Sequence, residues 1–122
     1  MSENGPHRRL IVWEKAMNLV PDIYRLTREF PREERFGLSD QMQRAAVSVT
    51  ANIAEGQARS QPKEFAQFLR IARGSLAELE THLTLCQRVG LIAKTDLQPL
   101  MALADEVGKM IRGLQKAISN NH

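Results

Sequence analysis

The sequence predicts an all-helical protein that folds as an antiparallel up-down-up-down four-helix bundle. Apolar residues recur at spacings of three and four along four long segments, and no stretch sustains the alternation typical of strands. The connections between these segments are short, so neighbouring helices are expected to run antiparallel. A chain of 122 residues is one domain's length. We therefore expect one bundle over residues 1–122, with loose ends at about 1–8 and 119–122.

The first predicted helix, residues 9–30, carries two neighbouring apolar stripes. One consists of Leu10, Trp13, Met17, Val20 and Tyr24, and the other of Val12, Ala16, Leu19, Ile23, Leu26 and Phe30. Pro21 is expected to bend this helix or to remove one backbone hydrogen bond, since proline has no N–H. Two stripes are more apolar surface than one neighbouring helix covers, which favours self-association.

The second and third predicted helices meet near residue 60. The second is expected to begin at an N-cap, Ser39, and to end at Gly56 or shortly after it. The third has Pro62 in its first turn and runs to about Val89, where Gly90 stops it. Its apolar residues alternate in steps of four and three, the spacing of a packed seam: Phe65, Leu69, Ala72, Leu76, Leu79, Leu83 and Cys86.

The fourth predicted helix opens with a capping box from Thr95 to Gln98. Its seam repeats the same alternation along Leu97, Leu100, Ala104, Val107, Ile111, Leu114 and Ile118.

The composition indicates a mildly basic protein of the cytoplasm. The 17 Lys and Arg against 14 Asp and Glu leave a net charge of +3, which permits a phosphate-rich partner without requiring one. The single cysteine excludes an internal disulfide, and no signal segment or long apolar run predicts membrane insertion.

No pattern in the sequence predicts catalysis. Di-iron bundles need a Glu-x-x-His pair, but Glu78 and Glu80 precede His82 by four and two residues. His82 and Cys86 are one turn apart, yet Cys86 completes an apolar seam and is expected to behave as a small hydrophobe. No glycine-rich phosphate loop is present. We expect no enzymatic activity, no metal, no cofactor and no small-molecule substrate.

A basic strip is predicted around the start of the third helix. It consists of Arg44, Arg59, Lys63, Arg70 and Arg73. Such a strip could neutralise phosphates without reading base sequence. The alternative is a solvated face whose cations pair with Glu64 and other carboxylates. Aromatic residues are few and lie mostly at seam positions, so recognition through stacked bases is not expected.

A polar cluster is predicted in the middle of the bundle, formed by Asn52, Glu55, Gly56, Arg73 and Ser75. A buried carboxylate needs a partner, and Arg73 is the candidate partner of Glu55. The pair could fix the register of two helices, contribute to a subunit interface or belong to a ligand site. Gly74 inside a helix costs roughly 1 kcal/mol relative to Ala, which a close contact with another helix or subunit would justify.

Three ordered motifs resemble one known family. "LIVWEKAMNLV", "FGLSDQMQRAAVSVTANIAEG" and "EFAQFLRIARGSLAELETHL" are similar to the small four-helix-bundle proteins encoded in intervening sequences of bacterial 23S rRNA genes. The resemblance implies a ring-like homopentamer without catalytic residues. It also implies a relation to the accessory variability protein of diversity-generating retroelements, whose basic pentamer binds nucleic acid and a reverse transcriptase.

These observations predict a non-enzymatic, oligomeric protein that associates with RNA or DNA through a basic surface, in a role accessory to an rRNA insertion or a retroelement. The alternative is an interaction scaffold, for example for a reverse transcriptase, with no significant nucleic-acid binding of its own. No membrane partner is expected.

Overall fold

The computed structural model describes residues 6–120, with side chains from Arg9 onward, and within them it confirms the predicted four-helix bundle. The helices are α1 (Pro6–Arg28), α2 (Asp40–Ala58), α3 (Pro62–Arg88) and α4 (Lys94–Asn120). No strand occurs among these residues. Helices α1 and α4 thus include parts of the ends expected to be loose, and residues 1–5 and 121–122 lie outside the described part.

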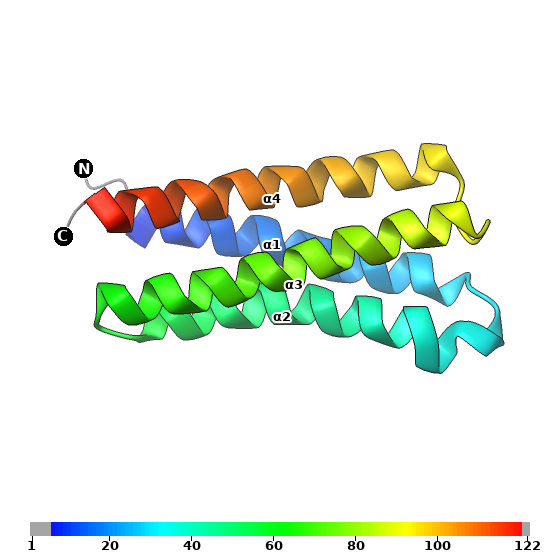
Figure 1. Cartoon of the computed structure of the whole chain (residues 1–122), viewed down its shortest axis with the longest axis horizontal. Helices are drawn as coiled ribbons and strands as arrows, with labels where there is room; N and C mark the ends of the chain where they lie inside the picture. The colour runs from blue at the N-terminus through cyan, green and yellow to red at the C-terminus, as the bar shows by residue number, and fades with distance from the viewer. Residues whose placement is uncertain (1–5, 121–122) are drawn as a thin grey trace.

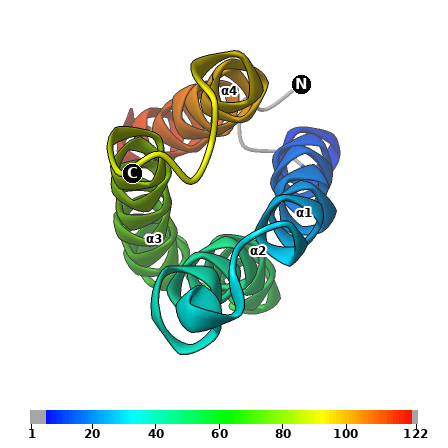
Figure 2. The same ribbon diagram turned by 90° about the vertical axis from the view of Figure 1, so that its right-hand side faces the viewer.

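The four helices are arranged in a ring in chain order, each antiparallel to the next (Figures 1 and 2). Helix α1 lies beside α2 and α4, and α3 lies beside α2 and α4. The α1–α2 and α3–α4 connections share one end of the bundle. The α2–α3 connection lies at the other end, with the start of α1 and the end of α4 (Figure 1). Among the described helices, none is long and apolar enough to cross a membrane.

The predicted seams form the core. All seven seam residues of α3 are buried, and on α4 only Leu97 of the predicted seam is half-buried. The second stripe of the first predicted helix is buried except for half-buried Leu26, and its last residue, Phe30, lies beyond the end of α1. The first stripe stays partly uncovered, with Leu10, Met17 and Tyr24 exposed. Helix α1 continues through exposed Pro21, which lies on the solvent side.

The end of α3 follows the predicted glycine stop. Gly90 has a φ of +85°, a left-handed conformation that glycine adopts without steric cost. Its N–H donates to the carbonyl of Gln87 at 3.1 Å, and the Leu91 N–H donates to the carbonyl of Cys86 at 2.8 Å. These two bonds make a Schellman motif, which satisfies carbonyls that the helix leaves free.

Two predicted helix starts are wrong in detail. Ser39 precedes α2 but makes no side-chain cap, because it is buried and already helical in a π-helical turn, Arg35–Ser39. That turn follows a short 3₁₀ turn, Arg32–Glu34. Helix α4 begins at Lys94, and the backbone N–H groups of Asp96 and Leu97 both donate to the backbone carbonyl of Ala93. Thr95 is therefore inside the first turn and cannot be the N-cap of a capping box.

Gly56 does not end α2, which continues to Ala58. It is buried, and a Cβ at this position would lie 2.6 Å from Cδ1 of Phe65 and 3.0 Å from Cβ of Phe68. The glycine therefore permits the close approach of α2 and the first turns of α3. The chain turns only at Arg59, which is extended with φ −82° and ψ 140°.

Candidate nucleic-acid interface

A basic groove runs between α3 and α4 on the solvent side of the bundle. Its volume is about 750 Å³. Three cations come from α3 and two from α4, and the lining contains no carboxylate: Lys63, Arg70, Arg73, Arg112 and Lys116, with Ala66, Gln67, Gln115, Ile118 and Ser119. Antiparallel packing sets the first half of α3 beside the last half of α4, which brings the five cations together (Figure 1).

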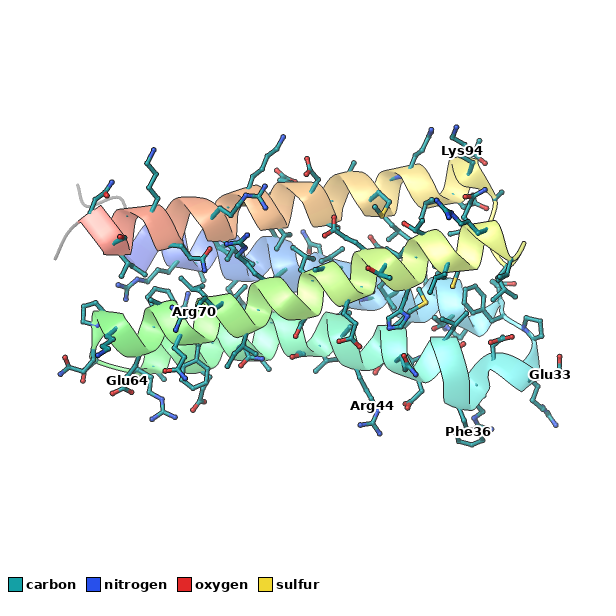
Figure 3. All side chains as sticks on the ribbon, viewed as in Figure 1. Glu33, Phe36, Arg44, Glu64, Arg70 and Lys94 are labelled. Atoms are coloured by element: carbon teal, nitrogen blue, oxygen red, sulfur yellow. The ribbon has the colours of Figure 1, made fainter. Side chains whose placement is uncertain are left out.

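Three of the five predicted basic residues meet in this groove, and two do not. Lys63, Arg70 and Arg73 are seven and three residues apart, so they share one side of α3. Arg44 borders a hollow between α1 and α2 and pairs with Asp40 at 3.0 Å. Figure 3 shows Arg44 on α2, away from Arg70. Its inclusion in the strip is wrong, because α1 and α2 form the opposite side of the ring (Figure 2).

Arg59 makes its contacts within the α2–α3 connection and the helix turns beside it. Its guanidinium pairs with Glu55 at 2.6 Å and with Glu64 at 3.8 Å, and it stacks over the ring of Phe68 at 5.2 Å. For this residue the alternative of a cation paired with Glu64 is correct. Arg59 is therefore part of the packing that closes this end of the bundle, and it does not line the groove.

Arg112 and Lys116 are groove cations that the sequence interpretation missed. They are four residues apart on α4, so they share a face. Their place beside the cations of α3 could have been predicted from the topology, because an antiparallel bundle sets the last turns of α4 beside the first turns of α3. In the described part of the chain, Lys63, Arg70, Arg112 and Lys116 form no ion pair.

One hydrogen bond joins the two walls of the groove. Nη1 of Arg73 donates to Oε1 of Gln115 at 3.0 Å, from α3 to α4. Beyond this bond, Arg73 and Arg112 also line a smaller hollow of about 110 Å³ that contains Glu80 and Asp105. Burial and the charge of Asp105 raise the pKa of Glu80, while Arg112 acts against this shift. Asp105 also pairs with Lys109 at 3.2 Å. The basic groove thus ends at two carboxylates.

The predicted polar cluster forms with different partners. The Glu55–Arg73 pair is absent within the chain, because Glu55 is exposed and pairs with Arg59, while Arg73 bonds Gln115. Asn52 and Ser75 are joined through Ser48, which the sequence interpretation missed. The Asn52 amide donates to the Ser48 carbonyl at 2.8 Å and to its hydroxyl at 3.0 Å.

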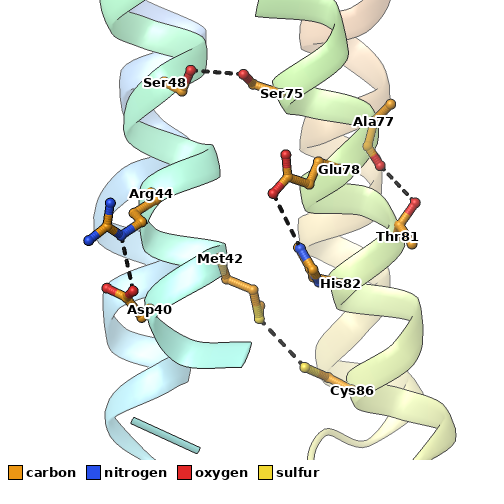
Figure 4. A network of polar contacts seen from close by, with 10 residues as sticks. All are labelled: Asp40, Met42, Arg44, Ser48, Ser75, Ala77, Glu78, Thr81, His82 and Cys86. Atoms are coloured by element: carbon orange, nitrogen blue, oxygen red, sulfur yellow. Dashed lines mark hydrogen bonds and ion pairs between the residues drawn. The ribbon is translucent and has the colours of Figure 1, made fainter. Parts of the chain in front are cut away.

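The link between α2 and α3 in this cluster is a pair of hydroxyls. The Ser48 and Ser75 oxygens are 2.8 Å apart (Figure 4). Ser48, Asn52 and Ser75 are neutral and half-buried, so this linked group needs no buried counter-ion. Its geometry connects two helices, which supports the structural interpretation of Asn52 and Ser75.

The family model of the 23S rRNA-intervening sequence protein matches residues 8–113. The chain belongs to this family. The matched range contains the three motifs that predicted the relationship, as well as Arg112 in the α4 wall of the groove.

A solved structure shows the same fold in another protein. The chain is similar to a protein of unknown function from the S23 ribosomal protein family of Bacteroides thetaiotaomicron VPI-5482, with a TM-score of 0.83 and 24% identity. The likeness covers 89% of this chain and 98% of that chain. No curated protein matches the sequence.

In this family member, the thiol of Cys86 is poorly suited to nucleophilic chemistry. Cys86 is buried 3.5 Å from the Met42 sulfur (Figure 4), and burial, followed by the charge of Glu34, raises the pKa of its thiol to about 11. His82 lies 3.5 Å from Glu78 on the same helix. Among the described residues, no group of three or more His, Cys, Asp or Glu could hold a metal ion.

Proposed function

We propose that this chain is a non-enzymatic protein that associates with nucleic acid through the groove between α3 and α4. The observation that carries the proposal is the charge of the lining, which has five cations and no carboxylate. Phosphates are the abundant anions that such a lining suits, because Lys and Arg neutralise them and release condensed counter-ions. The membership in a family named for intervening sequences of 23S rRNA is in keeping with a nucleic-acid partner.

The lining also indicates the mode of binding. No aromatic residue lines the groove, so base stacking contributes nothing there. Gln67, Gln115 and Ser119 add neutral donors that can bond phosphate or sugar oxygens. Binding is therefore electrostatic, sensitive to salt and independent of base sequence.

Charge reversal in the groove tests this proposal. Binding of the full chain to a labelled RNA hairpin, a DNA duplex and an unstructured oligonucleotide is measured by fluorescence anisotropy between 20 and 200 mM salt, roughly the range over which phosphate contacts weaken. Arg70→Glu/Arg112→Glu is expected to weaken binding at least tenfold. The matched control, Arg25→Glu/Arg44→Glu, reverses two paired cations outside the groove and is expected to have little effect. Absence of binding at low salt, or equal effects of the two variants, contradicts the proposal.

We infer that the binding unit is a homo-oligomer, a ring of five copies as the family resemblance implies. The supporting observation is the uncovered stripe of α1, where Leu10, Met17 and Tyr24 are 50%, 41% and 40% exposed at spacings of seven. Exposed apolar stripes of this kind gain stability when another surface covers them. Light scattering is expected to give about five times 13.8 kDa. A mass of one chain contradicts the inference.

A protein-interaction scaffold is the second candidate, and the same α1 stripe favours it. In that case a protein partner such as a reverse transcriptase covers the stripe, and the cations of the basic groove only keep the protein soluble. The purified chain is mixed with the reverse transcriptase of its own genome after nuclease treatment. A complex that survives Arg70→Glu/Arg112→Glu but is lost in Met17→Glu supports the scaffold. An enclosing rRNA gene or an adjacent retroelement in the genome distinguishes the two accessory roles.

A further inference from the structure

The cations of the groove lie on two walls that face each other. Lys63, Arg70 and Arg73 belong to α3, while Arg112 and Lys116 belong to α4. The Arg73–Gln115 bond crosses between the walls at one end. A polyanion that uses all five charges must therefore lie inside the groove, between the two helices.

The size of the groove favours one strand over two. A volume of about 750 Å³ is in the range of pockets for drug-sized ligands, roughly 300–1,000 Å³. A duplex is much wider, since its major groove alone is about 12 Å across. It would rest on the rim of the groove and reach the cations of one wall. A flexible single strand can enter the groove and contact both walls.

The length of the groove corresponds to a short stretch of chain. Lys63 and Arg73 are ten residues apart on α3, a span of about 15 Å at the helical rise. At about 3.4 Å per stacked nucleotide, this span holds four or five nucleotides. The five cations thus match the number of phosphates that fit beside them.

The end of the groove is set by charge. Beyond Arg73 and Arg112, the same seam between α3 and α4 presents Glu80 and Asp105. Phosphates that continued along the seam would meet two carboxylates, and Lys109 pairs with only one of them. The negative charges of Glu80 and Asp105 repel a phosphate strand at this position.

We infer that the groove holds a single-stranded stretch of four or five nucleotides by its phosphates, and that Glu80 and Asp105 end this track. The inference rests on the proposed function and adds the form of the nucleic acid and the length of its contact. No aromatic side chain of the groove stacks on the bases, so DNA and RNA strands of any base sequence are accepted.

Length and strandedness are tested with the full chain and labelled deoxyadenosine oligomers of two to ten nucleotides, beside a hairpin duplex of matched phosphate number. The affinity is expected to rise with length up to about five nucleotides, and the duplex is expected to bind at least tenfold more weakly. The slope of log affinity against log salt concentration is expected to be about −3.5 for five phosphate contacts. In Arg70→Gln or Arg112→Gln the slope is expected to become shallower by about 0.7. Arg44→Gln is the matched control and should leave the slope unchanged.

The boundary is tested by neutralising its carboxylates. Glu80→Gln/Asp105→Asn is expected to tighten binding of the ten-nucleotide strand by roughly threefold, the size of a modest surface charge effect. The affinity of this variant is also expected to keep rising with strand length beyond about five nucleotides. Glu78→Gln/Glu106→Gln makes the same charge change outside the groove, beside His82 and Lys15, and controls for net charge.

The outcomes separate this inference from the proposed function. Equal affinity for duplex and strand, with both lowered by Arg70→Gln, overturns the single-strand inference and leaves nucleic-acid association intact. Equal gains from the boundary variant and its control overturn the assignment of Glu80 and Asp105. Failure of every oligonucleotide to bind at low salt overturns both the inference and the proposed function.

Discussion

Gly56 of α2 lies directly against the ring of Phe65 on α3, and a Cβ at position 56 would come within 2.6 Å of that ring. Phe65 is buried, with only 1% of the residue exposed. Arg9 stacks on it at 4.6 Å and adds a cation–π contact from α1. The missing side chain of one glycine thus sets how closely three helices meet at this end of the bundle.

Gly56→Ala is expected to lower the free energy of unfolding by up to about 2 kcal/mol. Overpacking costs about 1–3 kcal/mol, and the roughly 1 kcal/mol that alanine gains in a helix interior offsets part of this cost. Gly74→Ala is the matched control, because Gly74 is also helical but a Cβ there would meet nothing within 4 Å. That change is expected to stabilise the chain by about 1 kcal/mol in urea unfolding. Equal effects of the two changes would contradict the packing role of Gly56.

The Ser48–Ser75 hydroxyl pair is expected to couple α2 to α3. Ser75→Ala should cost about 0.5–1.5 kcal/mol, the usual net value of one hydrogen bond. Ser48→Ala should cost more, because Asn52 also loses one of its two bonds. In a double-mutant cycle of urea unfolding, the two changes together should cost less than their sum by at least 0.5 kcal/mol, roughly the smallest coupling typical of residues in contact. Strict additivity would show that the pair contributes nothing.

Glu80→Gln is expected to raise the unfolding free energy at neutral pH. Burial and Asp105 raise the pKa of the Glu80 carboxyl above its ordinary value of 4.5, so the folded chain binds this proton more tightly than the unfolded chain. The stability that this proton contributes is present below pH 4.5 and is lost as the pH rises through the raised folded value. The advantage of Glu80→Gln should therefore disappear in acid.

Denaturant unfolding of the Glu80→Gln variant and the parent chain at several pH values measures this difference. Glu14→Gln, which removes an exposed carboxylate on α1, serves as the control for the change in net charge. An advantage of Glu80→Gln that grows in acid would reverse the assigned sign.

Cys86 is expected to react very slowly with thiol reagents in the folded chain. A pKa of about 11 leaves roughly one thiolate in a thousand at pH 8, and the sulfur is also buried. Labelling is followed by mass spectrometry in buffer and in concentrated urea, where the reaction should become fast. Rapid labelling of the native chain at pH 7 would contradict both the burial and the raised pKa.

The fold was predictable because helical periodicity is a local property of the sequence. The seam of α3 from Phe65 to Cys86 is buried as its spacing predicts, and Gly90 stops the helix through its own backbone freedom. Helix starts were less predictable. Ser39 has the residue type of an N-cap, but the preceding π-helical turn buries it and gives it helical dihedral angles.

The candidate site was predictable only in part. Lys63, Arg70 and Arg73 could be grouped by their spacing on one helix, whereas Arg112 and Lys116 are far away in sequence. The prediction of a Glu55–Arg73 pair was wrong because a nearer partner was available to each residue. Arg59 is one turn from Glu55, and Gln115 reaches Arg73 from α4.

The sequence by itself determined the class of fold, the four helices and their buried faces, since these depend on residue spacing within each helix. The tertiary structure alone decided which side chains meet between helices. That choice depends on how antiparallel helices align and on how closely they approach, as at Gly56 and Phe65. The tertiary structure places cations of α3 and α4 on the two walls of one groove. It also joins polar residues around Asn52 into a neutral link between α2 and α3.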